Sequence, residues 1–412
     1  MPPDGTSTSA GGWPHLAYEE LPWTRGEAYQ LASHRQRKEH AGTYNAVVPL
    51  AIAHRSVLLP GHVLAQVEDA TTEIARFDVQ MGGEIAPFSA VLLRSESAAS
   101  SQIENLTASA RAIAEVELGV GGTTNALQIV ANVRAMSAAV ALADRLSPAT
   151  ILEMHRSLME AIEPDIAGRW RREQVWIGGT ALGPHKAWFV PPHHSRVEGG
   201  IADLVQFTQR DDLPILAQAA VAHAQFETIH PFADGNGRTG RALLHSLLRN
   251  KGLTTSVTVP VSAGLLADTA SYFAALDAYR TGDTTPIVVA AAQASLESLI
   301  NGRQLVRDLR SIRRSWNDKV SARRTSAVWQ VADLLVQHPV VNAKLVAEQL
   351  GIATANVYRY LEPLERAGVL TEFNDMRRNR AWRSKEILGA LDAFAARVGR
   401  RTAPSPQGGN SS

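Results

Sequence analysis

The feature that most constrains this chain is the helical spacing of its apolar residues. They recur at three- and four-residue intervals through much of the 412 residues, which is typical of amphipathic α-helices. We expect helices over residues 26–34, 56–77, 89–115, 125–143, 216–229 and 242–248. Ser147, followed by Pro148, is expected to cap one more helix. The sequence therefore predicts a mainly α-helical protein.

Two segments break this pattern. Residues 175–192 have short β-prone ends around a Gly/Pro-rich turn, which predicts a β-hairpin. Residues 371–383 are a second hairpin candidate, centred on Asn374-Asp375. From Arg303 to Arg324 the chain is basic, which favours a charged connecting helix ahead of a separate C-terminal module.

Composition removes several functional classes. The chain has no cysteine, which excludes disulfide frameworks, zinc fingers, iron–sulfur clusters and cysteine nucleophiles. It has 41 Lys+Arg against 40 Asp+Glu, which excludes a globally basic nucleic-acid-binding protein. This balance does not exclude a local basic patch. No apolar run is long enough for a transmembrane helix, and the N-terminus lacks the pattern of a secretory signal. We expect no membrane contact and a cytoplasmic location.

Residues suited to catalysis and ligand binding are most concentrated between His230 and Arg241, in the segment HPFADGNGRTGR. A Gly-rich turn that leads into a helix directs several N–H groups at one point, which favours an anion. Arg238 and Arg241 are suited to phosphate oxygens, and Asp234 to Mg²⁺ shared with phosphates. His230 is the group there that accepts a proton near neutral pH. The segment therefore predicts phosphate binding with base catalysis.

The same segment also contains the dinucleotide-binding pattern G-x-G-x-x-G, at residues 235–240. That pattern requires a preceding strand in a βαβ unit. Here the preceding residues are expected to be helical, so we reject this interpretation.

The segment resembles the motif H-x-F-x-[D/E]-G-N-G-R-x-x-R of the Fic family and matches every specified position. Residues 175–192 resemble the β-hairpin flap on which that family docks its target as an added strand. Ser100–Asn105, SSQIEN, resembles the family's inhibitory motif [S/T]-x-x-x-E-[G/N]. The resemblance covers roughly residues 20–300. It implies a Fic helical core with a β-hairpin flap.

The resemblance implies transfer of AMP from ATP to a Ser, Thr or Tyr hydroxyl of a protein target, which includes the chain itself as a candidate. It makes His230 the catalytic base and Asp234 the ligand of Mg²⁺. The residues that it assigns to ATP are Gly235, Asn236, Gly237, Arg238, Thr239, Gly240, Arg241 and Tyr272. De-AMPylation, or transfer of another phosphate-bearing group on the same core, is an alternative activity.

Ser100 and Glu104 carry the regulatory hypothesis. A Glu104 carboxylate aimed at Arg241 would occupy the place of the ATP γ-phosphate and hold activity low. The alternative for Glu104 is an ordinary solvated carboxylate on a helix.

The C-terminal part is expected to form a small winged helix-turn-helix domain. Residues 325–337 are expected to be helical, Asn342 to begin a helix that ends at Gly351, and Thr354 to cap the next. The hairpin after them contains Arg377, Arg378, Arg380 and Arg383. Asn356, Arg359 and Tyr360 would then be the exposed recognition residues. Pro363 departs from the pattern, so that helix is expected to end early or kink.

We therefore expect a disordered tail at 1–20, a helical region with the inhibitory segment at 21–130, and a catalytic core at 131–300. A connector at 301–326, the winged domain at 327–395 and a second disordered tail at 396–412 would follow. DNA and a protein are alternative partners of the winged domain, and a homodimer is one candidate assembly. A transcription regulator that senses nucleotide is the alternative to an enzyme.

Overall fold

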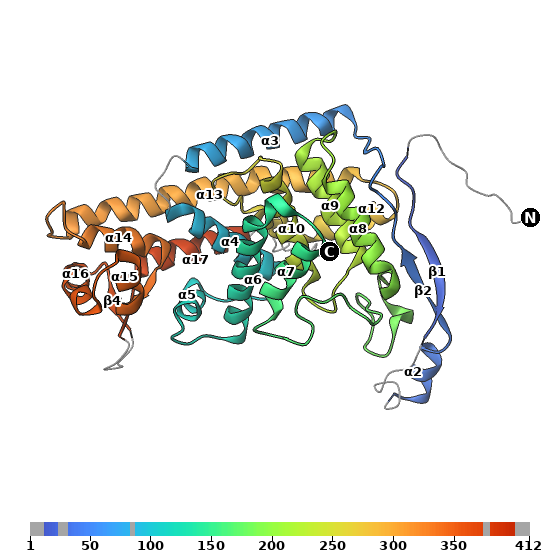
Figure 1. Cartoon of the computed structure of the whole chain (residues 1–412), viewed down its shortest axis with the longest axis horizontal. Helices are drawn as coiled ribbons and strands as arrows, with labels where there is room; N and C mark the ends of the chain where they lie inside the picture. Colours follow the sequence, from blue (N-terminus) through green and yellow to red (C-terminus); the bar gives the residue numbers. More distant parts are fainter. Residues whose placement is uncertain (1–11, 24–31, 83–86, 374–379, 400–412) are drawn as a thin grey trace, which may run out of the picture. The chain divides into compact units, whose positions relative to one another are not determined.

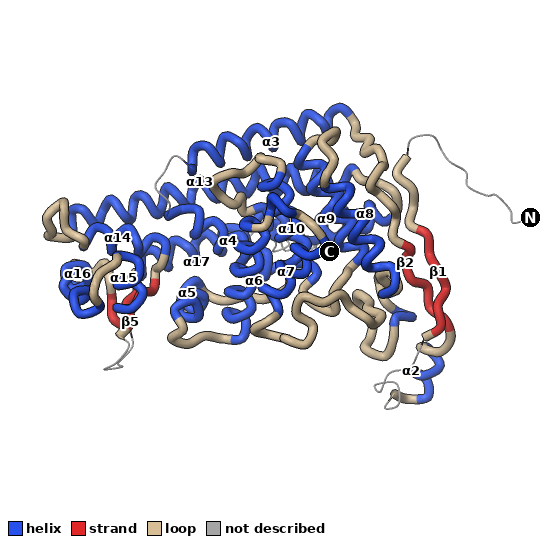
Figure 2. Tube along the Cα trace, viewed as in Figure 1, coloured by secondary structure: helices blue, strands red, loops and turns tan. Residues whose placement is uncertain are grey.

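Helices dominate the described part of the chain (Figure 1), and its strands are short (Figure 2). The computed structural model describes residues 12–23, 32–82, 87–373 and 380–399. Among these residues, no helix has the length and apolar character needed to cross a membrane. The prediction of a mainly α-helical fold is confirmed.

The chain divides into two compact units, each built from several stretches of sequence. Unit 1 comprises Met1–Asp69, Ala138–Asn250 and Ala270–Ala291, and unit 2 comprises Ala70–Ser137, Lys251–Thr269 and Ala292–Ser412. The helices α3 (Gly61–Gly82), α6 (Thr124–Ala141) and α13 (Thr285–Lys319) have residues in both units. The domain boundaries expected from the sequence stay predictions.

Unit 1 has a two-stranded antiparallel ribbon and a helical core. The ribbon pairs β1 (Ala17–Pro22) with β2 (Thr43–Val48), in a register that sets Ala17 opposite Val48. The helices of this unit are α2 (His34–Glu39), α7 (Pro148–Met159), α8 (Val197–Thr208), α9 (Ile215–Ile229), α10 (Asn236–Asn250) and most of α12 (Thr269–Arg280). Nearly every side chain of α9 is buried, because α8 and α10 both pack against it.

Local signals explain where several of these helices begin. Ser147 caps α7 through its hydroxyl, which accepts the N–H of Thr150 at 3.3 Å, and Pro148 follows as the first helical residue. This cap is therefore confirmed. The helix expected over 216–229 is α9, whereas the one expected over 242–248 begins earlier, at Asn236 inside the motif.

Unit 2 contains further helices and a small antiparallel sheet of order β3-β5-β4. Its first helices are most of α3 and α6, with α4 (Pro87–Ile103), α5 (Ala110–Leu118) and α11 (Val261–Ala267). Its later elements are most of α13, then α14 (Val328–Gln337), β3 (Val340–Asn342), α15 (Ala343–Leu350), α16 (Thr354–Arg366), β4 (Thr371–Glu372), β5 (Ala381–Arg383) and α17 (Lys385–Gly399). The helix α4 packs against α11, α14 and α17.

The last elements follow the order helix, strand, helix, helix, strand, strand, which supports the winged-helix interpretation. The cap at Asn342 and the end at Gly351 are confirmed, since Asn342 accepts the N–H of Leu345 at 2.8 Å and Gly351 is left-handed. The cap at Thr354 is wrong, because α16 begins there after Ala353 without a side-chain cap. Of the two outcomes expected at Pro363, the early end is wrong, because α16 continues to Arg366, and the kink stays a prediction.

Other expectations need correction. The expected helix over 89–115 is two helices, since α4 ends at Ile103 and α5 starts at Ala110. The tail expected over 1–20 is wrong for its second part, since Trp13 packs on Tyr279 with ring centroids 5.6 Å apart and β1 begins at Ala17. The helix expected over 26–34 lies mainly outside the described residues.

The two expected hairpins have different outcomes. In 175–192, isolated bridges join Ile177 to Phe189 and Thr180 to Gly183, so the segment folds back as a hairpin-like flap without regular strands. In 371–383, β4 and β5 pair as expected, while the turn with Asn374-Asp375, Arg377 and Arg378 lies outside the described residues. The basic connector is the second half of α13, which begins earlier than expected and ends at Lys319.

Candidate active site

The motif begins at a sharp corner where α9 ends. His230 is the C-cap of this helix and has a left-handed backbone, with φ 50° and ψ 61°. Its N–H donates to the carbonyl of Phe226 at 2.8 Å. Few non-glycine residues adopt this conformation, and they often do so at functional sites. The corner directs the chain into a short loop, residues 231–235, that ends at α10.

The surroundings of His230 favour its neutral form. Burial, and then the positive charges of Arg171 and Arg280, lower the pKa of His230 to about 3 from its ordinary value of 6.5. A backbone contact with Glu227 opposes this shift. At neutral pH the ring is therefore unprotonated, which is the form that a general base requires.

Asn236 determines the shape of the loop. Its side-chain oxygen accepts the N–H of Phe232 at 2.9 Å, and its side-chain nitrogen donates to the carbonyl of the same residue at 2.9 Å. Both ends of the amide are thus used inside the motif. The side chain of Asn236 closes the loop, and the contact with ATP that the resemblance implies for this residue stays a prediction.

His155 of α7 holds the loop from the other side. Its Nδ1 accepts the N–H of Gly168 at 3.0 Å, so Nε2 carries the proton that is donated to the carbonyl of Asp234 at 3.0 Å. The ring also stacks on Phe232, with centroids 3.7 Å apart and planes 2° apart. Burial lowers the pKa of His155 to about 4, which keeps this donor arrangement neutral.

The first turns of α10 carry the remaining motif residues. Arg238 and Arg241 are buried, while the side chain of Asp234 is 59% exposed. A guanidinium nitrogen of Arg238 lies 3.6 Å from a carboxylate oxygen of Asp234. Gly235 is left-handed with φ 77°, and a Cβ there would lie 3.0 Å from Leu158. The loop therefore requires glycine at this position.

Thr239, Gly240 and Tyr272, which the resemblance assigned to ATP, all have close contacts within the protein. Thr239 is fully buried, and its N–H donates to the carbonyl of Gly235 at 3.0 Å. A Cβ on Gly240 would lie 2.7 Å from a carboxylate oxygen of Glu227, so this glycine allows α10 to approach α9. Tyr272 is 2% exposed, and its hydroxyl is 2.8 Å from Nε2 of His223. All three pack within unit 1, and their contact with ATP stays a prediction.

The motif fits a Mg²⁺ ion that is shared with a substrate. Among the described residues there is no group of three or more histidine or carboxylate side chains that would form a protein cage for a metal. Mg²⁺ commonly uses one or two carboxylates and takes its other ligands from phosphates and water. The exposed carboxylate of Asp234, in the loop that leads into α10, suits that role.

The segment expected to be inhibitory forms the end of α4 in unit 2. Ser100 is buried within the helix, and Glu104 is exposed just after it. Asn105 is left-handed with φ 60°, and the N–H of Leu106 donates back to the carbonyl of Ser101 at 3.0 Å. The last motif position accepts Gly or Asn because these residues tolerate a left-handed backbone. Glu104 and Arg241 belong to different units, so their contact stays a prediction.

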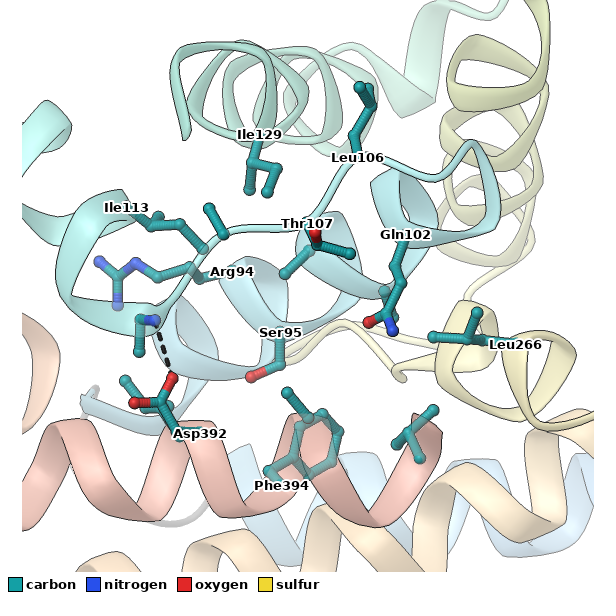
Figure 3. A pocket seen from close by; sticks show the side chains of 17 residues that line it. Arg94, Ser95, Gln102, Leu106, Thr107, Ile113, Ile129, Leu266, Asp392 and Phe394 are labelled. Atoms are coloured by element: carbon teal, nitrogen blue, oxygen red, sulfur yellow. Dashed lines mark hydrogen bonds between the residues drawn. The ribbon is translucent and has the colours of Figure 1, made fainter. Parts of the chain in front are cut away.

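The C-terminal helix α17 supports the segment that follows Glu104. The carboxylate of Asp392 accepts the N–H of Ala110, the first residue of α5, at 2.8 Å (Figure 3). A cavity of about 70 Å³ lies beside this contact, with Gln102 and Leu106 in its wall. Arg94 of α4 forms an ion pair with Glu117 of α5 at 2.9 Å. The middle of α4 is therefore bonded to α5, and the start of α5 is bonded to α17.

Sequence reasoning missed three residues around the motif, namely His155, Arg171 and Arg280. Arg171 is buried and donates from Nε to the carbonyl of His230 at 2.8 Å. The guanidinium of Arg280 lies 3.6 Å from the ring centroid of Phe189 in the flap. An open pocket of about 750 Å³ adjoins the loop at Ala233. None of the three residues stands in a recognisable motif, so no local signal identified them.

Comparisons with known proteins match the part of the chain that contains the motif. Residues 145–248 match the Fic/DOC family model. Protein adenylyltransferase fic-1 of Caenorhabditis elegans is 33% identical over 159 residues, which is 38% of this chain and 28% of that protein. Protein adenylyltransferase Fic of Drosophila erecta is 33% identical over 156 residues, 36% of this chain and 28% of that protein.

A solved structure has the same fold over a larger part of the chain. The Fic family protein from Desulfovibrio desulfuricans G20 superposes with a TM-score of 0.51 at 21% identity, over 80% of this chain and 97% of that one. The chain spans under a third of the length of the curated relatives that it matches. Residues 145–248, which contain the His230 corner, its loop and most of α10, are a Fic domain.

Proposed function

We propose that this chain is a protein adenylyltransferase that transfers AMP from ATP to a Ser, Thr or Tyr hydroxyl of a protein. The hydroxyl oxygen forms a bond with the α-phosphorus, the bond from that phosphorus to the bridging oxygen breaks, and pyrophosphate leaves. His230 takes the proton of the hydroxyl. Such transfers depend mainly on positioning and on neutralising charge, and the motif supplies both.

One observation carries this proposal. A neutral His230 stands at one end of a closed loop whose other end is the N-terminus of α10, where Arg238 and Arg241 are buried. Backbone N–H groups at a helix N-terminus attract phosphate, and the helix dipole adds to the attraction. A base and a phosphate site therefore lie within one segment of unit 1.

The other motif residues have distinct roles in this proposal. Asp234 would hold Mg²⁺ against the phosphates, and the ion would neutralise their negative charge. The N–H groups of the loop and the Arg238 side chain would bind phosphate oxygens, and Arg241 would take the γ-phosphate. Asn236 would act through the shape that it gives the loop rather than through its amide group.

The test is incubation of the full chain with labelled ATP and Mg²⁺, followed by intact-mass measurement. We expect the wild-type chain to gain AMP on itself or on an added target. His230→Ala should lower the rate by about 10²- to 10⁴-fold, the usual contribution of a general base. Undiminished transfer by His230→Ala would refute the assignment.

We further propose that Glu104 keeps the enzyme weakly active. Glu104 lies just after α4, on a turn that Asn105 stabilises. This turn fixes where the carboxylate stands at the end of the helix. Replacing Glu104 by glycine should raise automodification by about 5- to 150-fold, the usual range of coupling between sites. The double variant Glu104→Gly/His230→Ala should return to background. Equal rates for wild type and Glu104→Gly would contradict the inhibition.

The same site would also suit removal of AMP, or transfer of a different phosphate-bearing group. A target that already carries AMP distinguishes these reactions, because a hydrolytic enzyme would release AMP from it without ATP. Loss of that release in His230→Ala would assign it to the same site.

The winged module has an exposed face that favours DNA as a second partner. Asn356 and Arg359 are exposed on α16, the second of the two short helices. The basic connector contributes less to DNA binding than its charge suggests, because two of its cations are already in ion pairs. Arg313 pairs with Asp333 at 2.7 Å, and Lys319 pairs with Glu386 at 2.8 Å. A gel-shift titration should show binding that weakens steeply with salt. Binding that does not change with salt would favour a protein partner instead.

A further inference from the structure

A single buried side chain connects two parts of the candidate active site. Arg171 donates from Nε to the carbonyl of His230 at 2.8 Å and from Nη2 to the carbonyl of Ile229 at 3.4 Å. Its own N–H donates to the carbonyl of Pro231 at 3.0 Å. Arg171 therefore holds the left-handed corner through carbonyl groups on both sides of the His230 Cα.

The same guanidinium also reaches the flap. Nη1 of Arg171 donates to the carbonyl of Glu173 at 3.0 Å, and Nη2 donates to the carbonyl of Pro192. Glu173 precedes the flap and Pro192 ends it. Both ends of the flap and the His230 corner are therefore bonded to one planar group.

The corner needs such support. A non-glycine residue with φ 50° is strained by the contact of its Cβ with the backbone, and persists where its surroundings fix it. Arg171 occupies the carbonyl oxygens of this turn and leaves the imidazole of His230 uninvolved. It therefore restrains the direction of the ring without competing for its nitrogens.

We propose that Arg171 is a positioning residue, which fixes His230 and the flap relative to each other so that a hydroxyl docked on the flap meets the ring. This inference rests on the proposed AMP transfer. The role requires arginine, because a guanidinium donates in several directions from one plane. A lysine ammonium in the same place keeps the charge but leaves some of these buried carbonyls without a donor.

A neighbouring residue provides a matched control. Arg172 is exposed and stands next to Arg171 in the sequence. Both Arg171→Lys and Arg172→Lys are made in the Glu104→Gly background, where transfer is expected to be fastest. Rates are measured well below each melting temperature, so that both proteins are folded and a purely structural role would leave kcat unchanged.

Arg171→Lys should lower kcat by about 10- to 100-fold, since small misplacements of reacting groups are that costly. The KM for ATP should change by less than about threefold, because Arg238 and Arg241 are untouched. Arg172→Lys should match its parent. An unchanged kcat in Arg171→Lys, or a loss confined to KM, would overturn the proposal. If Arg171→Lys does not fold, Arg171→Gln is measured in the same way.

Hydrogen–deuterium exchange on the full chain gives a readout that does not depend on activity. Arg171→Lys should speed exchange in both 173–192 and 229–235, while α4 stays as in the parent. Faster exchange in only one of these segments would show that Arg171 does not couple them. If no variant of this chain transfers AMP, the proposed function fails, and exchange still decides the coupling.

Discussion

Nε2 of His155 lies 3.0 Å from the carbonyl oxygen of Asp234, and this hydrogen bond ties the middle of α7 to the motif loop. The ring donates there because Gly168 already occupies its other nitrogen. A protonated His155 would lose the bond from Gly168, so the loop is held in place by a neutral imidazole.

The stability of the fold should therefore depend on pH in the range where histidine titrates. Burial lowers the pKa of His155 to about 4, and those of His223 and His230 to about 3. Between about pH 6.5 and pH 4 the unfolded chain takes up protons that the folded rings do not, so stability falls as the pH falls. Urea midpoints at pH 7, 6 and 5 measure this change.

A variant isolates one contribution to that trend. His155→Gln has no titrating ring at this position and should flatten the dependence of the midpoint on pH. Carboxylates affect stability only below this range. Burial raises the pKa of Asp78, but hydrogen bonds from Thr255 and its neighbours outweigh burial and lower this pKa below 3.8. A midpoint that stays constant from pH 7 to pH 5 would contradict the prediction.

The pH dependence of catalysis should differ from that of an ordinary histidine. Because His230 has a pKa of about 3 in the free protein, kcat/KM for ATP should stay constant between about pH 8 and pH 6. Initial rates in the Glu104→Gly background are the measurement. An acid limb centred near pH 6.5 would show that the ring is more exposed in solution than here.

Gly240→Ala tests the close approach of α9 and α10. The added Cβ would lie 2.7 Å from Glu227 and 2.9 Å from Phe226, so we expect a loss of about 1–3 kcal/mol in the free energy of unfolding. Gly199→Ala in α8 is the control, since nothing lies within 4 Å of its Cβ. That variant should gain about 0.4–1 kcal/mol. Equal urea midpoints for both variants would count against this packing.

Asn105 offers a test of the turn after Glu104. Asn105→Val places a branched side chain at φ 60° and should cost about 1–2 kcal/mol of unfolding free energy. Asn105→Gly should be neutral or stabilising there. Denaturant unfolding of the two variants is the comparison, and a tolerated valine would mean that this turn is not left-handed in solution.

Asp392→Ala removes a cap from α5. We expect a loss of about 0.5–2 kcal/mol, the usual cost of an N-terminal cap, because the N–H of Ala110 loses its acceptor. Asp392→Asn keeps an oxygen acceptor and should lose less. If both variants unfold at the wild-type midpoint, the contact between α17 and α5 does not contribute to stability.

Local signals in the sequence were sufficient for features that depend on neighbouring residues. The caps at Ser147 and Asn342 and the glycine end at Gly351 follow from contacts within a few residues. The break after α4 was missed because the apolar spacing continues across it, while the turn depends on the backbone of Asn105.

Contacts between distant residues explain the other omissions. Arg171 and His155 act on main-chain carbonyls 59 and 79 residues away, and a carbonyl has no side-chain signature in a sequence. Trp13 belongs to a Gly/Ser-rich tail by composition, but it packs on Tyr279 in α12. In each case the partner becomes visible only when the chain is folded.

The left-handed corner at His230 affects the choice of an inactive enzyme for trapping experiments. Alanine at this position removes the base but keeps the Cβ, and with it the strain of a left-handed backbone. His230→Gly removes the imidazole while relieving the strain at φ 50°. The glycine protein would therefore be the better bait for capturing a target protein, because it lacks the base without the backbone strain that alanine keeps.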